Sequence, residues 1–212
     1  MTQVFQNVLK HIIALICFIA VAVVYFFPQF QGKVLQQTDV IQYQGAASEV
    51  IDYREEGETI LWTNSMFSGM PTYQISAPNK NNVSKYLEKT IQGVFFGRPT
   101  GYFLGGMIAF YIAMLLLGIN SWVALIGAIT FAFATNNLVL YEAGHTGKVR
   151  VLMVSILIIS GVINIYRKKF ITGGLAFASG LAISIYANHF QMTYYLGVIL
   201  GIYGIVGAID LI

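Results

Sequence analysis

Long apolar runs dominate this chain and exclude an ordinary water-soluble fold. The first run, from Ile12 to Phe27, contains no charged residue and follows Lys10 and His11. A helix needs about 20 mostly apolar residues to cross the hydrocarbon core of a bilayer, which is about 30 Å thick. The chain is 57% hydrophobic and 10% charged, whereas soluble domains carry about 25% charged residues. The sequence therefore predicts an all-α polytopic membrane protein.

We expect about six transmembrane helices, all close to the required length. They cover Val8–Phe27, Tyr102–Leu117, Trp122–Leu140, Val151–Ile165, Ile171–Ala187 and Thr193–Ile209. The glycine pairs Gly101/Gly105 and Gly197/Gly201 have the four-residue spacing that lets membrane helices approach closely. Asn136 and Asn137, inside the third span, are predicted to form hydrogen bonds between helices.

One polar insert, residues 31–99, separates the first two spans and holds seven of the nine acidic residues. Apolar side chains recur at helical spacing from Val40 to Val50, which predicts a helix that Thr38 caps and that ends near Gly57. An aromatic-anchored loop should follow from Thr59 to Tyr73.

The second part of the insert is predicted to contain a turn and another helix. Residues Ala77 to Val83 are polar and turn-like. From Ser84 to Phe96 the pattern indicates an amphipathic helix, which fits the membrane interface or a small core within the insert. The last apolar run stops at Ile212 without a polar tail, so we expect residues 1–212 to be the N-terminal part of one longer transmembrane domain.

A basic tripeptide, Arg167-Lys168-Lys169, determines the predicted orientation. The positive-inside rule places this short loop in the cytoplasm. Counting spans backwards puts the N-terminus with Lys10 in the cytoplasm and the insert outside. The loop from Tyr141 to Arg150 carries two cations and falls outside, against the rule, but the N-terminus and the tripeptide agree.

This topology places three polar segments on the external face. Asp39 is the first candidate, with the alternative that it only stabilises a helix N-terminus. The second segment is Gly144-His145-Thr146-Gly147, followed by Lys148 and Arg150. It suits an anion such as a phosphate, because backbone N–H groups and cations are available. A plain turn with cationic anchors at a membrane interface is the alternative.

The remaining candidates are Glu142, His189 and Gln191. Glu142 is either a functional acid or an interfacial acid paired with Lys148 or Arg150. A histidine near the end of a span, such as His189, is often only a hydrogen-bonded interfacial residue.

Several functions are disfavoured by what the sequence lacks. The net charge of +3 comes from dispersed residues, which argues against a nucleic-acid partner. No Asp, Glu, Lys or Arg lies in the middle of a span and no broken helix is apparent, which argues against an ion-coupled transporter. A single cysteine, Cys17, excludes a disulfide framework.

The order of these motifs resembles the YfhO-like family of bacterial membrane proteins, within the GT-C superfamily of membrane glycosyltransferases. The resemblance rests on Asp39 with its following helix, on Trp62 and the segment Phe67-Ser68-Gly69-Met70-Pro71, on Gly144-His145-Thr146-Gly147-Lys148, and on Asn188-His189-Phe190-Gln191 with Tyr194 and Tyr195. It covers nearly the whole chain.

The resemblance implies a GT-C-like fold in a bacterial plasma (inner) membrane and an enzyme that transfers a sugar. The donor would be a polyprenyl-phosphate-linked sugar and the acceptor an envelope glycan or protein on the outer face. By position, Asp39 would be the general base or a metal-orienting acid, and Glu142 the second acid. Some members bind a divalent cation, Mg or Mn, through such acids. In this chain neither Asp39 nor Glu142 has an adjacent acidic residue.

The resemblance assigns the other polar residues to substrate. His145, Lys148 and Arg150 would hold the lipid phosphate, while His189 and Gln191 would line the site. Two alternatives remain: a non-enzymatic envelope protein that binds a polymer or partner through its external loop, and a fragment of a lipid or glycan transporter.

Overall fold

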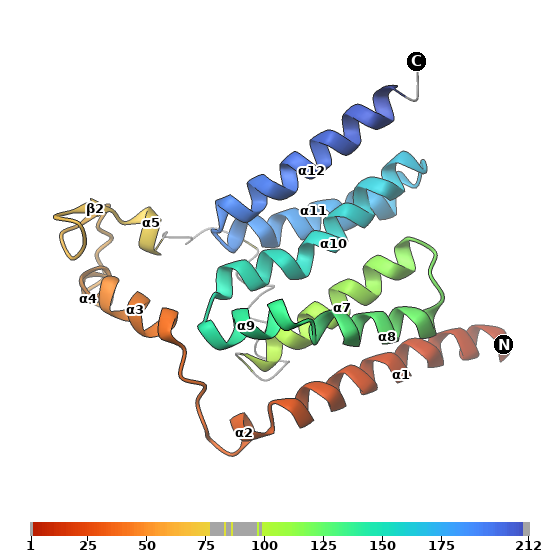
Figure 1. The fold of residues 1–212 in the computed structure, drawn as a ribbon, viewed down its shortest axis with the longest axis horizontal. Coiled ribbons are helices and arrows are strands. Elements are labelled where there is room, and N and C mark those ends of the chain that lie inside the picture. Colours follow the sequence, from red (N-terminus) through yellow and green to blue (C-terminus); the bar gives the residue numbers. More distant parts are fainter. Residues whose placement is uncertain (1, 77–82, 84–85, 87–96, 98, 210–212) are drawn as a thin grey trace.

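Helices form most of the structure, a computed structural model that describes residues 2–76, 83, 86, 97 and 99–209 (Figure 1). The apolar helices are α1 (Thr2–Tyr25), α7 (Thr100–Leu116), α8 (Ser121–Ala132), α9 (Thr135–Ala143), α10 (Thr146–Tyr166), α11 (Phe170–Tyr186) and α12 (Phe190–Ile209). The insert holds α3 (Thr38–Ala46), α4 (Ser48–Glu55), β1 (Trp62–Thr63), β2 (Met70–Pro71) and α5 (Tyr73–Ser76), and the short α2 (Phe27–Phe30) precedes it.

In the part of the chain that the structure describes, three helices are long and apolar enough to cross a membrane: Phe5–Tyr25, Thr146–Tyr166 and Phe190–Gly207. A fourth span results if the bent pair α8–α9 counts as one. The two other apolar helices, α7 and α11, have 17 residues each, which corresponds to about 25 Å at 1.5 Å per residue. The architecture is therefore mostly helical and compatible with an all-α membrane protein, with three to four candidate spans among the described residues.

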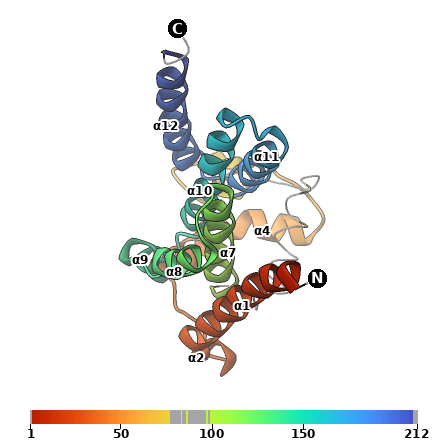
Figure 2. The same cartoon turned by 90° about the vertical axis from the view of Figure 1, so that its right-hand side faces the viewer.

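Helix α10 lies at the centre of the bundle. Half of the residues in its most apolar stretch are buried, compared with 17% for α1 and 6% for α12. Figure 2, which views the molecule along its longest axis, shows α7 and α10 in the middle with α1 and α12 on opposite sides. Apolar side chains of α1, α7, α8, α9 and α10 form the main core, in which Phe103 and Met107 are fully covered.

Helices α10 and α11 pack at backbone distance because glycines face each other. A Cβ on Gly161 would lie 2.6 Å from the backbone nitrogen of Phe177, and one on Gly173 would lie 2.7 Å from the carbonyl oxygen of Gly161. By contrast, the predicted packing role of Gly197 and Gly201 is not seen, since a Cβ on either would meet no atom within 4 Å. The close approach occurs where a second helix offers glycine at the same height.

The bundle has two different ends. At the basic end lie the turn 117–120 between α7 and α8 and the turn Arg167–Lys169 between α10 and α11. At the insert end lie residues 31–76 and the turns that lead into α10 and α12 (Figure 1). The three polar segments predicted to share one face of the membrane are all at the insert end.

The insert begins with two short helices rather than the single predicted helix. The chain bends at Ala47 (φ −96°, ψ 2°), which is fully buried. Thr38 is the first helical residue rather than the N-cap; the N-cap is Gln37, whose side chain caps nothing in α3. The expected loop contains a two-stranded antiparallel hairpin, in which Trp62 is opposite Pro71 and Thr63 is opposite Met70. The predicted turn 77–83 and the helix 84–96 lie almost wholly outside the described residues.

Candidate functional site

The first contact at the insert end joins Asp39 to His145, which are 106 positions apart in the sequence. One carboxylate oxygen of Asp39 meets Nδ1 of the His145 imidazole. The two side chains are 38% and 35% exposed, so the pair is accessible from outside. Asp39 lies in the first turn of α3, where the helix dipole stabilises a negative charge. An acid and an imidazole in contact provide a proton acceptor and a group to orient it.

Two further contacts hold this pair in place. The side-chain amide of Gln37 donates a hydrogen bond to the backbone oxygen of Tyr141, which ties the start of α3 to the end of α9. Gly144 follows α9 with φ +89°, and a Cβ there would lie 2.9 Å from Cβ of Gln37 and 3.2 Å from Cγ2 of Val40. The glycine therefore supplies both the left-handed turn before His145 and the room for α3.

His189 lies beside the first turn of α10. A Cβ on Gly147 would lie 3.3 Å from Cδ2 of His189, so the two are in direct contact. Nδ1 of His189 is buried and makes no hydrogen bond within the described part of the chain. Burial lowers the pKa of His189 below its ordinary value, and the neighbouring Lys148 lowers it further. The imidazole is thereby kept neutral near pH 7.

Arg150 faces the helices rather than the solvent at the insert end. Its guanidinium carbon lies 5.7 Å from the ring centre of Tyr102 and 5.9 Å from that of Tyr186. Its Nε also lies 3.4 Å from the backbone oxygen of Thr146. The cation thus stabilises the junction of α7, α10 and α11 by cation–π contacts. These contacts give Arg150 a structural role between the helices.

Glu142 and Gln191 stand apart from these contacts. Glu142 is exposed, and Asp39–His145 is the one ion pair recorded among the described residues, so the alternative pairing with Lys148 or Arg150 is not seen. Gln191 is exposed and donates a hydrogen bond to the hydroxyl of Tyr195 on its own helix, at 2.8 Å.

The acids do not assemble a metal site in the part of the chain that the structure describes. No group of three or more His, Cys, Asp or Glu side chains there is placed to hold a metal ion. One oxygen of Asp39 is directed at His145 rather than at Glu142. These residues therefore do not fit a divalent cation.

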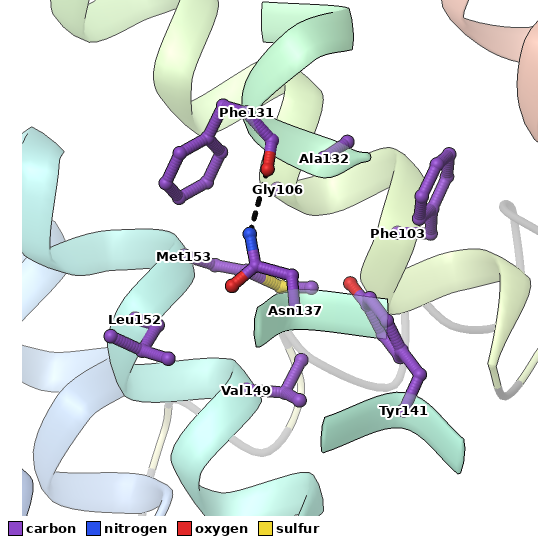
Figure 3. A pocket seen from close by; sticks show the side chains of 9 residues that line it. All are labelled: Phe103, Gly106, Phe131, Ala132, Asn137, Tyr141, Val149, Leu152 and Met153. Atoms are coloured by element: carbon purple, nitrogen blue, oxygen red, sulfur yellow. Dashed lines mark hydrogen bonds between the residues drawn. The ribbon is translucent and has the colours of Figure 1, made fainter. Parts of the chain in front are cut away.

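Contrary to the expectation from sequence, the segment that leads to Gly144 and His145 is a broken helix. Helices α8 and α9 form one apolar segment bent by 46°. The side-chain amide of Asn137 donates a hydrogen bond of 2.7 Å to the backbone oxygen of Phe131, at the end of α8 (Figure 3). That oxygen also accepts the backbone N–H of Ala134 at 3.2 Å. Asn137 therefore caps the break instead of joining two spans, and Asn136 is exposed. The signal was present, since Thr135, Asn136 and Asn137 are residues typical of helix ends.

The side chains beside the break are apolar apart from Asn137 and the hydroxyl group of Tyr141. A cavity of about 10 Å³ lies beside it, among residues that include Phe103, Tyr141 and Met153 (Figure 3). This is about the space that one water molecule needs. Broken helices also occur at transporter binding sites, so the bend removes one of the two arguments against transport. The middle of each predicted span still lacks Asp, Glu, Lys and Arg, and the residues that line this cavity are uncharged.

The hairpin of the insert has its own organising acid, Glu49, which sequence inspection did not single out. Its carboxylate accepts hydrogen bonds from the Thr63 hydroxyl at 2.5 Å and from the backbone N–H of Asn64 at 2.7 Å. These bonds, that from Thr63 above all, lower the pKa of Glu49. The loop between the strands has positive φ at Phe67, Ser68 and Gly69, and the Phe67 side chain is 84% exposed.

Comparisons of the chain with protein-family models, with curated proteins and with solved structures find no match. The arrangement of the residues themselves is therefore the basis for a functional proposal. It brings Asp39, His145, Lys148 and His189 to one end of the bundle, from three separate segments.

Proposed function

We propose that this chain belongs to a GT-C-type membrane glycosyltransferase. It would transfer a sugar from a polyprenyl-phosphate-linked donor to an envelope glycan or protein at the insert end of the bundle. All six apolar segments cross the bacterial plasma membrane in this proposal, with α8 and α9 together as one span. The insert faces outward, and the turn Arg167–Lys169 faces the cytoplasm by the positive-inside rule.

The observation that carries the proposal is the contact between Asp39 and His145. Glycosyl transfer to a hydroxyl requires a proton acceptor, which typically contributes about 10²–10⁴-fold to the rate. It also requires positive charge near the departing phosphate. Lys148 lies in the first turn of α10, close enough to affect His189, and the N-terminus of that helix favours an anion.

The test uses the full chain in lipid vesicles with a radiolabelled polyprenyl-phosphate-linked hexose. We expect Asp39→Asn to insert normally and to lose transfer by about 10²–10⁴-fold, because the variant breaks the acid–imidazole pair that supplies the proton acceptor. His11→Gln serves as the control, because His11 lies in α1 and contacts Tyr111 in the bundle. Unchanged transfer by the Asp39→Asn variant would refute the assigned site.

A second candidate function is non-enzymatic binding of an envelope polymer or partner through the insert. The exposure of Phe67, together with Leu61 and Trp62 at 74% and 54%, favours it. This function predicts that Phe67→Ser or removal of residues 62–73 abolishes activity in cells, whereas Asp39→Asn does not. The glycosyltransferase predicts that Asp39→Asn alone is sufficient to abolish it.

A further inference from the structure

We infer that His145, rather than Asp39, is the group that takes the proton from the acceptor, and that Asp39 positions it. This inference rests on the proposed function and names the reacting atom within the same site. It starts from which atoms of the two side chains meet, namely Oδ2 of Asp39 and Nδ1 of His145.

The chemistry of the contact determines the tautomer of the imidazole. An ionised carboxylate only accepts hydrogen bonds, so Nδ1 of His145 must carry the proton. In a neutral imidazole the other nitrogen, Nε2, then has a free lone pair. Nδ1 is the ring nitrogen of His145 that has a recorded partner among the described residues, and the side chain is 35% exposed. Nε2 is therefore the nitrogen left to act as a base toward a substrate.

Asp39 is less suited to accept the proton itself. One of its oxygens already accepts a hydrogen bond from His145 and is therefore not free to take the proton of an acceptor. A general base works best when its pKa is near the working pH. Free imidazole titrates at about 6.5 and a free carboxylate at about 3.9, so the imidazole class is the better match.

The surroundings keep the imidazole in one position. His145 is the residue before α10, its backbone N–H bonds to the Leu140 oxygen at 3.0 Å, and Gly144 before it packs on α3. Lys148, in the next turn, and His189, against Gly147, are the other titratable groups near it. The pair thus has the relation of acid and imidazole that orients a general base.

The transfer step begins at the hydroxyl group of the acceptor. Nε2 of His145 accepts the hydroxyl proton while the acceptor oxygen forms a bond to the anomeric carbon of the sugar. The bond from that carbon to the phosphate oxygen breaks, and its electron pair leaves with the polyprenyl phosphate. The imidazolium that forms is stabilised by the carboxylate of Asp39. Lys148 and the start of α10 offset the charge of the departing phosphate.

The first test reads the tautomer by ¹⁵N NMR of histidine-labelled full chain in nanodiscs, at about two pH units above the ordinary imidazole pKa of about 6.5. His11, His145 and His189 are the three histidines of the sequence, so single His→Gln variants assign each signal. We expect His145 to be protonated at Nδ1, and to change towards Nε2 protonation in Asp39→Asn. A wild-type His145 protonated at Nε2, or one that Asp39→Asn leaves unchanged, overturns the inference.

The second test measures transfer from the same polyprenyl-phosphate-linked hexose. His145→Gln should lower kcat by about 10²–10⁴-fold with little change in KM. The double variant with Asp39→Asn should be no slower than the slower single variant, because the two residues act as a unit. Retained transfer by His145→Gln, with transfer lost in Asp39→Asn, would make Asp39 the base. If the wild type transfers no sugar while the NMR result holds, it is the proposed function and the proton-transfer step that fail.

Discussion

The two ends of the bundle terminate their helices in different ways. At the basic end α7 finishes in a Schellman motif, with Ile119 N–H bonded to Met114 oxygen and Gly118 N–H to Leu115 oxygen. Asn164 and Arg167 then donate to the next free carbonyl oxygens, those of Leu116 and Leu117, each at 3.0 Å.

The insert end uses its polar groups differently. Asp39 and His145 bond to each other across two chain segments and stay a third exposed, while the buried Nδ1 of His189 has no partner among the described residues. Asn164 and Arg167 at the basic end have a structural role, because they donate to the backbone, although Oδ1 of Asn164 is itself buried without a partner among the described residues. At the insert end Gln37 also donates to the backbone, but Asp39 and His145 bond to each other and are exposed enough to meet a substrate. This contrast is why we place the chemistry at the insert end.

Gly144 at the insert end and Gly118 at the basic end both have φ +89°, but of the two only Gly144 packs against neighbouring side chains. Substituting alanine at each should therefore destabilise the protein by different amounts. Gly118→Ala should cost about 1–2 kcal/mol for a left-handed residue. Gly144→Ala should cost about 1–3 kcal/mol more, because its Cβ must displace Gln37. Denaturant unfolding in micelles measures both. Only Gly144→Ala should also disturb the Asp39–His145 contact, and equal costs for the two variants would show that the packing of α3 on Gly144 contributes nothing.

Asn164→Ala tests the structural role of the basic end. The variant leaves the buried carbonyl oxygens of Leu116 and Ser160 without their side-chain donor, a loss of about 1–3 kcal/mol. The folded fraction should retain its transfer activity. The exposed Asn136→Ala is the matched control and should change the unfolding free energy little. A change in kcat with Asn164→Ala would contradict the division of roles between the two ends.

His189 makes stability at the insert end depend on pH. Its pKa in the folded protein is lowered, so the unfolded chain binds the proton more readily. Stability is then complete above the unfolded value of about 6.5 and is lost as pH falls through the folded value. The midpoint of thermal unfolding should therefore decrease below about pH 6.5. His189→Gln should reduce this slope and His11→Gln should not; equal slopes in both would exclude His189 as the cause.

Arg167→Gln should have the smallest effect. Its hydrogen bond to Leu117 oxygen is exposed to solvent, and such interactions contribute about 0.5 kcal/mol. The unfolding free energy should hardly change. Orientation is the more informative measurement: removing one of three adjacent cations weakens the positive-inside signal. Accessibility of a cysteine placed in the insert would show whether that side of the protein still faces outward.

Much of the site could be found from sequence because rare residue types mark it. Asp39, the Gly-His-Thr-Gly segment and His189 stand out in a chain of apolar runs, and the structure brings them to the same end of the bundle. Their pairing could not be found, since the contact of Asp39 with His145 depends on how Gln37 and Gly144 pack across two distant segments. Arg150 could not be placed either, because its two tyrosine neighbours come from different helices.

The sequence by itself determined the membrane class, the helical content and the position of the polar insert, because these follow from local composition and periodicity. Which glycines lie between closely packed helices depends on the tertiary structure. Gly161 lies opposite Gly173 of the next helix, whereas a Cβ on Gly197 would meet no atom within 4 Å in the described part of the chain. The tertiary structure also decided where the apolar segment of α8 and α9 bends and which atom of His145 meets Asp39. Each of these depends on distances between residues far apart in the chain, which no local pattern records.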